Sequence, residues 1–433
     1  MKPFARIGIP AVLVALAMLV SPSAARAQNS RGCAWPLEWS PEGIGNWAIP
    51  DTYARWWVMP FDNYQTMTIK GTYPNARFFS FAAYNTNSLK MSAGLAGHLY
   101  DVEIRPDPGS VNPFAEPGAG NGTYTVVISR AGQSSGNAIT VSSDFAWVVF
   151  RLYVPGPDPS LGGRSLMGGV PLPTISVTGN GGSQQLQPCS PVNRLDDVNV
   201  FRGMLFPVDL SGSEGTLSSD QLWFAPPRVP PPALLPNPDG NYMAMLPGDT
   251  YQPGRIIVIH GKAPGFPNTF EGSPIWVPAR GFRTVDMRYW SLCEVDFMLP
   301  LSSPACATDL TTTVEGGYYT IVISDDLFRP DWLKPNVNWM PWGDEQYPKM
   351  LILRNVLTTD NFPYSIQKAI TADCTFNFNF PSIPDRNEVD TAGQCAQGVM
   401  GDYYPVAVWC DKATFVAGGV RACLKASEEP ETK

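Results

Sequence analysis

Apolar and polar positions alternate in two short segments of the chain, and the two segments resemble each other. In each, every second residue is apolar and would lie on one face of an extended chain: Tyr124, Val126 and Ile128 within residues 122–129, and Tyr319, Ile321 and Ile323 within residues 317–324. A period of two predicts β-strands with one buried face. We therefore expect the same strand, buried on the same side, in both places.

Four further short matches occur in the same order along the chain, each about 200 residues apart. The pairs are residues 51–53 with 249–251, 69–71 with 259–261, 77–80 with 288–291, and the arginines Arg151 and Arg354 inside apolar runs. Collinear matches of this kind indicate an internal duplication of one β-rich module.

The rest of the chain has the composition of a turn-rich β-protein. Forty-four prolines and 39 glycines separate short runs of valine, isoleucine, tyrosine, phenylalanine and threonine. We predict an all-β fold of two tandem antiparallel β-sandwich, jelly-roll-like modules with few short helices. Helix is expected at residues 362–371 and, more weakly, at 51–58.

The predicted organisation has six segments. These are a signal peptide at 1–27, an N-terminal segment at 28–47, module 1 at 48–178, a Gly/Ser-rich then Pro-rich linker at 179–240, module 2 at 241–371, and a disulfide-stapled C-terminal tail at 372–433.

The N-terminus is typical of a secretory signal. Lys2 and Arg6 precede an apolar run at 9–20, and residues 25–27 form a small-x-small cleavage site. The run is too short to span a bilayer, so we expect no transmembrane segment and a secreted or periplasmic protein. Cleavage would move the net charge from −8 to about −11, which disfavours nucleic acid as a partner. The oligomeric state is left open.

Eight cysteines form an even set, as expected of a disulfide-bonded exported chain. Proximity along the chain predicts three local pairs and leaves one long-range pair. The four are Cys293–Cys306, Cys374–Cys395, Cys410–Cys423 and Cys33–Cys189. No cysteine or histidine cluster has zinc-ligand spacing.

Residues of module 2 carry a resemblance to other proteins. Residues 288–292 (Arg-Tyr-Trp-Ser-Leu), 317–324 and 338–343 (Asn-Trp-Met-Pro-Trp-Gly) are similar to an "arginine-aromatic-serine … asparagine-tryptophan-leucine-proline" signature. That signature is found in uncharacterised exported bacterial proteins with jelly-roll-like domains of unknown function. Module 1 departs from it, because nothing before Trp147 matches the second half. The resemblance implies a fold and no activity.

Few residues in the chain suggest catalysis. His98 and His260 are the two histidines, and no G-x-S-x-G motif occurs. We predict no cofactor and no metal, although oxygen ligands at residues 385–390 leave calcium open. Asp101 and Glu103 would share one face of a strand, as a glycosidase or lyase pair could.

Aromatic residues between 332 and 342 are the most distinctive local feature. Trp332, Trp339 and Trp342 lie close together, and exposed rings beside polar groups form platforms for sugars or flat apolar ligands. The alternative is that the rings close the end of the sandwich. The predicted ligand-binding residues are Trp339, Trp342, Tyr289, Arg288 and Asp344.

Arg151 and Arg354 each interrupt an apolar strand, and burying a guanidinium requires a partner. We expect each to be buried against a carboxylate of its own module or backbone carbonyls, with a ligand carboxylate as the alternative. Two functions follow from these residues. The favoured one is a protein that binds a glycan, envelope component or small hydrophobic ligand, and the other is an extracellular carboxylate-dependent hydrolase or lyase.

Overall fold

A computed structural model provides the structure of the chain. It describes residues 32–42, 45–47, 49–86, 94–116, 122–132, 136–156, 167–179, 181–190, 220–229, 235–248, 251–267, 285–297, 301–345, 347–378 and 384–428. The predicted signal peptide at 1–27 lies outside these residues.

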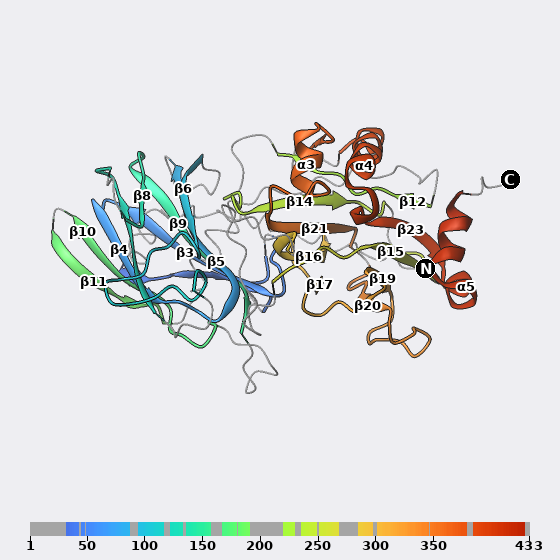
Figure 1. Cartoon of the computed structure of the whole chain (residues 1–433), viewed down its shortest axis with the longest axis horizontal. Coiled ribbons are helices and arrows are strands. Elements are labelled where there is room, and N and C mark those ends of the chain that lie inside the picture. The colour runs from blue at the N-terminus through green and yellow to red at the C-terminus, as the bar shows by residue number, and fades with distance from the viewer. Residues whose placement is uncertain are drawn as a thin grey trace, which may run out of the picture.

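The predicted all-β fold is confirmed: antiparallel sheets dominate and helices are few (Figure 1). Two sheets form a first unit, spanning residues 33–188. One sheet has the order β1 (Cys33–Ala34), β11 (Gly182–Pro188), β10 (Thr174–Gly179), β4 (Thr66–Thr72), β7 (Thr123–Ser129) and β8 (Ala138–Thr140). The other has the order β2 (Leu37–Trp39), β3 (Ala54–Asp62), β9 (Phe145–Pro155), β5 (Ala76–Thr86) and β6 (Gly94–Tyr100).

Two further sheets form a second unit, spanning residues 221–428. One has the order β12 (Gln221–Leu222), β23 (Val406–Asp411), β15 (Arg255–Lys262), β19 (Tyr318–Ser324) and β18 (Val314–Glu315), with β20 (Asn338–Pro341) also paired to β19. The other has the order β14 (Gly240–Met245), β21 (Lys349–Thr358), β16 (Met287–Asp296) and β17 (Ala305–Thr308). A two-stranded sheet joins β13 (Pro227–Arg228) to β22 (Phe376–Asn377).

The predicted apolar faces form the cores of the two units. Tyr124, Val126 and Ile128 of β7 are fully buried between the two sheets of the first unit. Their counterparts on β19, residues 319, 321 and 323, lie in the core of the second unit. Burying alternate residues of facing sheets removes apolar area from water, which is the main stabilising contribution in such a sandwich.

Strand pairing around these two tyrosines is similar in the two units. Gly71 on β4 lies opposite Tyr124, and Gly261 on β15 lies opposite Tyr319. A Cβ at either glycine would meet the facing tyrosine ring, so only glycine allows the strands to pair this closely. β8 pairs in parallel with β7, as β20 does with β19.

The sheets extend beyond the predicted module bounds of 48–178 and 241–371. β1 and β2 come from the predicted N-terminal segment, and β23 comes from the predicted tail. The Gly/Ser/Gln stretch predicted to start the linker forms β11, which pairs with β10 and β1. Its side chains are mostly exposed, and Leu186 alone in the strand is buried, so the strand has little apolar pattern to reveal it.

The helix predictions were right in one place and wrong in another. The helix α3 (Ile366–Thr371) lies within the predicted 362–371, and the Ser365 side chain caps its N-terminus. Residues 51–58 are not helical, because most of them belong to β3. The tail holds the helices α4 (Arg386–Met400) and α5 (Lys412–Glu428) and the short 3-10 helix η6 (Gly401–Tyr403), none of which was predicted.

All four predicted disulfides are present: Cys33–Cys189, Cys293–Cys306, Cys374–Cys395 and Cys410–Cys423. Among the described residues no cysteine is left unpaired. Several disulfides in one chain are typical of an oxidising compartment outside the cytoplasm. Across the described residues we find no helix whose length and apolarity would let it cross a membrane.

Candidate functional site

The tryptophans of the predicted aromatic loop pack against the second unit. Trp342 is 1% exposed, and its ring centroid lies 5.5 Å from that of Trp409. Trp339 is partly buried, and its Nε1 donates to the Ser324 hydroxyl at 2.9 Å. Trp332 is also partly buried. Trp342 thus packs in the core of the second unit, whereas Trp332 and Trp339 pack against a separate apolar cluster that includes residues of α5.

Arg288 and Tyr289 lie where the two units meet, and both are completely buried. Arg288 donates to the carboxylate of Asp101 at 2.7 and 3.1 Å, and the Tyr289 hydroxyl donates to Asp51 at 2.9 Å. Both acids belong to the first unit, whereas Asp344 is exposed on a loop of the second. The structure therefore does not gather the five predicted residues into one open site.

The predicted strand-borne acid pair is wrong. Asp101 and Glu103 lie in the turn that follows β6, where no shared strand face exists. Burial raises the pKa of the Asp101 carboxyl, and the nearby Arg288 guanidinium opposes that shift. Asp101 has no exposed surface and binds Arg288 of the second unit, so it stabilises the contact between the units.

Arg151 and Arg354 are buried as predicted, and each donates to a backbone carbonyl, one of the two kinds of partner expected. Arg354 also lies 3.7 Å from the carboxylate of Asp51, which belongs to the first unit and not to the module of Arg354. Arg151 donates to the Tyr84 hydroxyl at 2.8 Å and to the Leu235 carbonyl at 3.2 Å. Arg354 donates to the Ile49 carbonyl at 3.0 Å. Each arginine therefore binds a backbone carbonyl of the other unit: Leu235 belongs to the second unit and Ile49 to the first.

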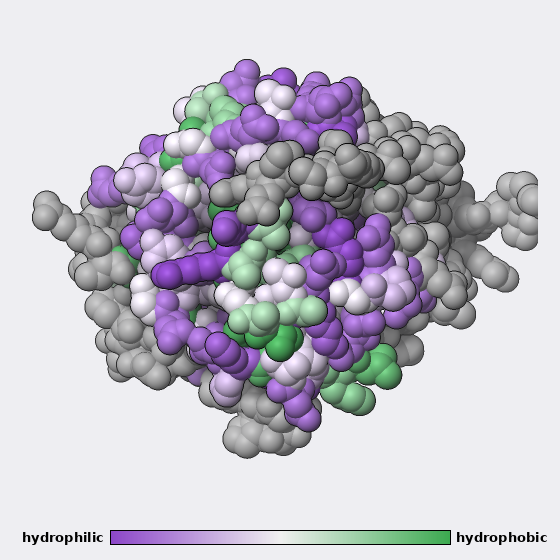
Figure 2. Space-filling view, turned by 90° about the vertical axis from the view of Figure 1, so that its right-hand side faces the viewer, coloured by the Kyte–Doolittle hydropathy of each residue, from purple (hydrophilic) through white to green (hydrophobic). Residues whose placement is uncertain are grey.

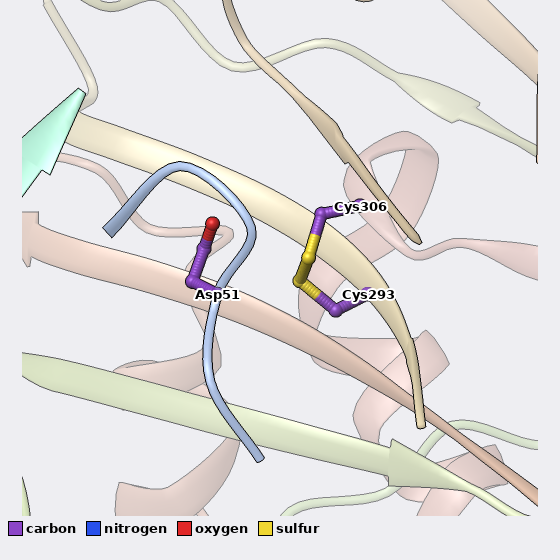
Figure 3. A group of neighbouring side chains, drawn as sticks. All are labelled: Asp51, Cys293 and Cys306. Atoms are coloured by element: carbon purple, nitrogen blue, oxygen red, sulfur yellow. A yellow bond between two sulfur atoms is a disulfide. The ribbon is translucent and has the colours of Figure 1, made fainter. Parts of the chain in front are cut away.

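A group of possible metal ligands lies at the same junction, but two of its members are disulfide-bonded. Asp51 lies beside Cys293 and Cys306, whose sulfur atoms are joined (Figure 3). Arg354 Nη1 lies 2.6 Å from Cys293 Sγ, and Asp51 accepts from the Ser291 hydroxyl at 2.6 Å. Sulfur in a disulfide is not the thiolate that binds metals, so these atoms fit a structural contact.

The acids considered for calcium start a helix. Asp385 is the N-cap of α4 and accepts from the Asn387 backbone N–H at 2.8 Å. Glu388 accepts from Asn377, and Asp390 pairs with Arg386 at 3.0 Å. Spread along a helix, these carboxylates already bind other groups of the chain.

The second unit has a small hollow between its two sheets and the helical segments. It holds about 290 Å³ of space, part of which is open solvent. Its lining is mainly aromatic and aliphatic: Lys262, Pro264, Met287, Trp290, Tyr319, Leu353, Asn355, Phe362, Tyr364, Met400 and Tyr403. Trp290 and Tyr319 are stacked with centroids 5.2 Å apart and belong to the buried core, so they form the floor.

Aromatic rings stand at the rim of this hollow. Tyr364, 44% exposed, stacks on Tyr403 with centroids 5.5 Å apart and planes 16° from parallel. Phe362 supports Tyr403 edge-on at 4.9 Å, and Lys262 Nζ lies 5.0 Å from the same ring. Supported rings beside a cation form a platform for a ligand that has both apolar and polar faces.

A second pair of stacked rings lies on β15 and β19, the strands that also carry Lys262 and Tyr319. His260 and Tyr318 are partly buried and stack with centroids 5.4 Å apart, and the Tyr318 hydroxyl donates to Asp402 at 3.0 Å. Burial lowers the pKa of His260, which lies 3.1 Å from the Thr320 hydroxyl. At neutral pH His260 is therefore an uncharged ring, suited to stacking and hydrogen bonding.

The two units differ in one side chain close to the core tyrosine of each. Tyr73 and Ala263 occupy equivalent places: each backbone N–H donates at 2.9 Å to a glycine carbonyl, that of Gly122 or Gly317. The Tyr73 ring fills the first unit at 5.0 Å from the Tyr124 ring. In the second unit Ala263, between the lining residues Lys262 and Pro264, packs against the core without a ring.

Sequence reasoning missed the rim residues. Tyr364 follows Phe362 after β21, and Tyr403 follows α4, so the two are distant in the sequence and come from different predicted segments. The sequence does show a concentration of aromatic residues at 362–364 and 403–404, and this could have indicated the rim. These residues do not follow the alternation of a strand.

A cluster of charged residues is buried near Trp342. Lys349 Nζ lies 3.7 Å from Glu294 and also contacts Asp296. Burial raises the pKa of Glu294 well above its usual range, and Lys349 opposes that shift. The Glu294 side chain is only 1% exposed, so the acid has almost no surface for a substrate.

The surface at this end of the molecule is largely hydrophilic, with small separate hydrophobic patches (Figure 2). A broad apolar face, which would indicate a large protein partner, is not visible in that view.

Comparison with known proteins adds only a general likeness. No protein-family model and no curated protein matches the sequence. Among solved structures, an uncharacterised protein of Burkholderia cenocepacia is 12% identical with a TM-score of 0.47, covering 78% of this chain and 82% of its own. A Vibrio parahaemolyticus protein is 12% identical with a TM-score of 0.38, covering 74% and 89%. At these values neither likeness identifies a function.

Proposed function

We propose that this is an exported binding protein that holds a glycan on the ring platform of its second unit, defined as Tyr364, Tyr403, Lys262, Tyr318 and His260. The observation that carries the proposal is the exposed Tyr364 ring stacked on Tyr403 at the mouth of the hollow. Sugar rings have one apolar face and polar edges, so they match flat aromatic rings flanked by charged groups.

The platform also offers hydrogen-bonding groups for hydroxyls. Lys262 supplies ammonium donors, and Asp402 supplies a carboxylate on an exposed turn. Asp286, near Lys262, already accepts from the Gly265 backbone N–H, and burial raises its pKa. This mixture of rings and both charge signs favours a neutral polyhydroxylated ligand over a wholly apolar one.

Two alternatives are less well supported. A small hydrophobic ligand would need a pocket that encloses most of its surface, and the hollow, part of whose volume is open solvent, encloses too little space for that. A carboxylate-dependent hydrolase or lyase would need an accessible pair of acids. The acid whose pKa is raised most clearly near the aromatic loop, Glu294, is buried against Lys349.

The test is binding of the mature chain, residues 28–433, to a glycan array, followed by calorimetry with the best ligand. We expect Tyr364→Ala and Tyr403→Ala each to weaken binding about tenfold or more, since stacking on one ring contributes on the order of 1 kcal/mol or more. Phe328→Ala is the matched control, because Phe328 is an aromatic residue 81% exposed outside the platform.

The originally predicted loop provides the competing location. Trp339→Ala and Asp344→Ala alter residues of that loop that are partly or fully accessible. If these two variants lose glycan binding while Tyr364→Ala retains it, the site lies on the loop and the ring-platform proposal fails.

We also propose that the chain is exported through cleavage near Ala27 and that its two units arose by duplication. The disulfides support export. The matching pairs Gly71–Tyr124 and Gly261–Tyr319 support duplication. Mass spectrometry of the secreted protein tests the first proposal, and superposition of the strands of the two units tests the second.

A further inference from the structure

We infer that the hollow is a subsite for the acetamido group of an N-acetylated aminosugar, with the sugar ring lying on Tyr364 and Tyr403. This inference rests on the proposed glycan-binding function and specifies the class of glycan. It makes the hollow, rather than the rings, the feature that discriminates between sugars.

Size and lining suit a methyl group. Much of the space is open to solvent, so the hollow would not enclose a whole sugar ring, but a substituent can project into it from the rim. Met287, Leu353 and Met400 provide aliphatic walls, and each is at most 4% exposed. Placing an apolar methyl there removes it from water, whereas placing a hydroxyl there would leave a polar group without partners.

Polar groups at the edge suit the amide. Asn355 lines the hollow and is 4% exposed. Its Nδ2 donates to the Arg354 carbonyl at 3.2 Å, and its Oδ1 accepts from the Ile366 backbone N–H at 3.3 Å. An amide nitrogen carries two N–H groups, so the second can donate to the acetamido oxygen. Lys262 at the rim is a further donor to the same oxygen.

The first unit shows which part of the fold this specificity depends on. There Tyr73 fills the space over Phe79 and Tyr124, with ring centroids 6.0 and 5.0 Å away. In the second unit the equivalent residue is Ala263, which packs against the core that contains Trp290 and Tyr319 but has no ring. A tyrosine at this position would therefore bring a ring toward the floor of the hollow, as Tyr73 does in the first unit.

The experiment compares a trimer of N-acetylglucosamine with cellotriose on the full mature chain by calorimetry. The two probes share the sugar backbone and differ in the acetamido group, whereas a deacetylated glucosamine trimer tests the contribution of positive charge. We expect the acetylated trimer to bind at least about tenfold more tightly than cellotriose, the usual effect of filling or emptying a methyl-sized site.

Ala263→Tyr fills the hollow with the residue that the first unit already accommodates. We expect this variant to bind the acetylated trimer as weakly as cellotriose while its cellotriose affinity stays unchanged. Ala263→Ser is the control that keeps the space open. If Ala263→Tyr melts at a much lower temperature, Met400→Phe narrows the hollow from the α4 side and gives the same test.

The outcomes separate this inference from the proposed function. Equal affinity of the wild-type chain for the acetylated trimer and cellotriose overturns the acetamido subsite and leaves glycan binding standing. Preference for the acetylated trimer that survives both filling variants also overturns it. Failure to bind any glycan on the array overturns the proposed function itself, and the subsite with it.

Discussion

Arg288 of the second unit and Asp101 of the first form a bidentate ion pair, at 2.7 and 3.1 Å, that is completely buried between the units. A reciprocal pair joins Arg77 of the first unit to Asp309 of the second at 3.4 Å. Arg77 and Arg288 occupy matching positions at the starts of β5 and β16, and both acids follow the next strand, β6 or β17. Each unit therefore contributes one arginine and one aspartate to the two ion pairs.

We expect Arg288→Met to destabilise the protein by about 3–5 kcal/mol, because it leaves the Asp101 carboxylate buried without its cation. Chemical denaturation followed by circular dichroism measures the loss. Asp101→Asn in the Arg288→Met background should recover part of it, since the amide removes the unpaired charge.

Arg386→Met is the matched control for this prediction. Its partner Asp390 lies 3.0 Å away, but both side chains are about one-third exposed, so the loss should be below about 1 kcal/mol. Equal losses at Arg288 and Arg386 would show that the junction pair has no special importance for stability.

Stability should also depend on pH through Asp309. Burial raises the pKa of this carboxyl to about 7, and Arg77 opposes that shift. The folded state therefore binds the proton more tightly than the unfolded state, whose pKa is about 3.8. The contribution of Asp309 is most favourable below pH about 4, and it falls as the pH rises to about 7.

Asp309→Asn, which cannot titrate, isolates this contribution. The difference in unfolding free energy between wild type and Asp309→Asn should change by a few kcal/mol between pH 4 and 7 and stay constant above that. A constant difference across the whole range would mean that Asp309 titrates at its ordinary pKa in the folded protein.

The glycines opposite the core tyrosines should be intolerant of substitution, and to different degrees. A Cβ at Gly71 would lie 2.4 Å from the Tyr124 hydroxyl oxygen, and one at Gly261 would lie 2.9 Å from that of Tyr319. We expect Gly71→Ala to cost about 1–3 kcal/mol and Gly261→Ala less. Melting temperatures measure both.

Removing the hydroxyl tests the steric origin of the loss. Tyr124→Phe alone should be nearly neutral, since the hydroxyl has no hydrogen-bond partner among the described residues. Combined with Gly71→Ala, it should restore part of the stability. No recovery would assign the loss to strand backbone geometry instead.

The four disulfides should contribute unequally. Cys33–Cys189 closes a separation of 156 residues and Cys410–Cys423 one of 13. In the loop-entropy model, replacing the first pair by serine costs about 5 kcal/mol and replacing the second about 3 kcal/mol. Denaturation of the two double variants measures this difference. The reverse order would show that native contacts, not loop length, set the contribution of each bond.

Local patterns in the sequence were sufficient to predict the two central strands, their buried faces and the disulfide partners. Alternation in residues 122–129 and 317–324 identified β7 and β19 because strand side chains have a period of two. Strand β11 and the helices of the tail were missed. β11 has mostly polar side chains, and the prediction treated the tail as a chain held mainly by its disulfides.

The predicted ligand-binding residues were identified without knowledge of their exposure. A side chain can bind a ligand only if no other part of the protein covers it, and the sequence does not show this. Arg288 and Tyr289 resembled surface recognition residues in the sequence, yet packing of one unit against the other buries both. Trp342 is buried in the same way by the core of its own unit.

The sequence by itself thus determined the fold class, the disulfide pairing and which strand faces are buried, since each follows from local period, composition or cysteine position. Tertiary structure alone decided that Arg288 meets Asp101 across the units and that Tyr364 stacks on Tyr403. It also decided that the Tyr73 ring packs against Tyr124 in the first unit, where the second unit has Ala263. These relationships join residues far apart in the chain, and their physical cause is the packing of whole sheets and helices, which no local pattern records.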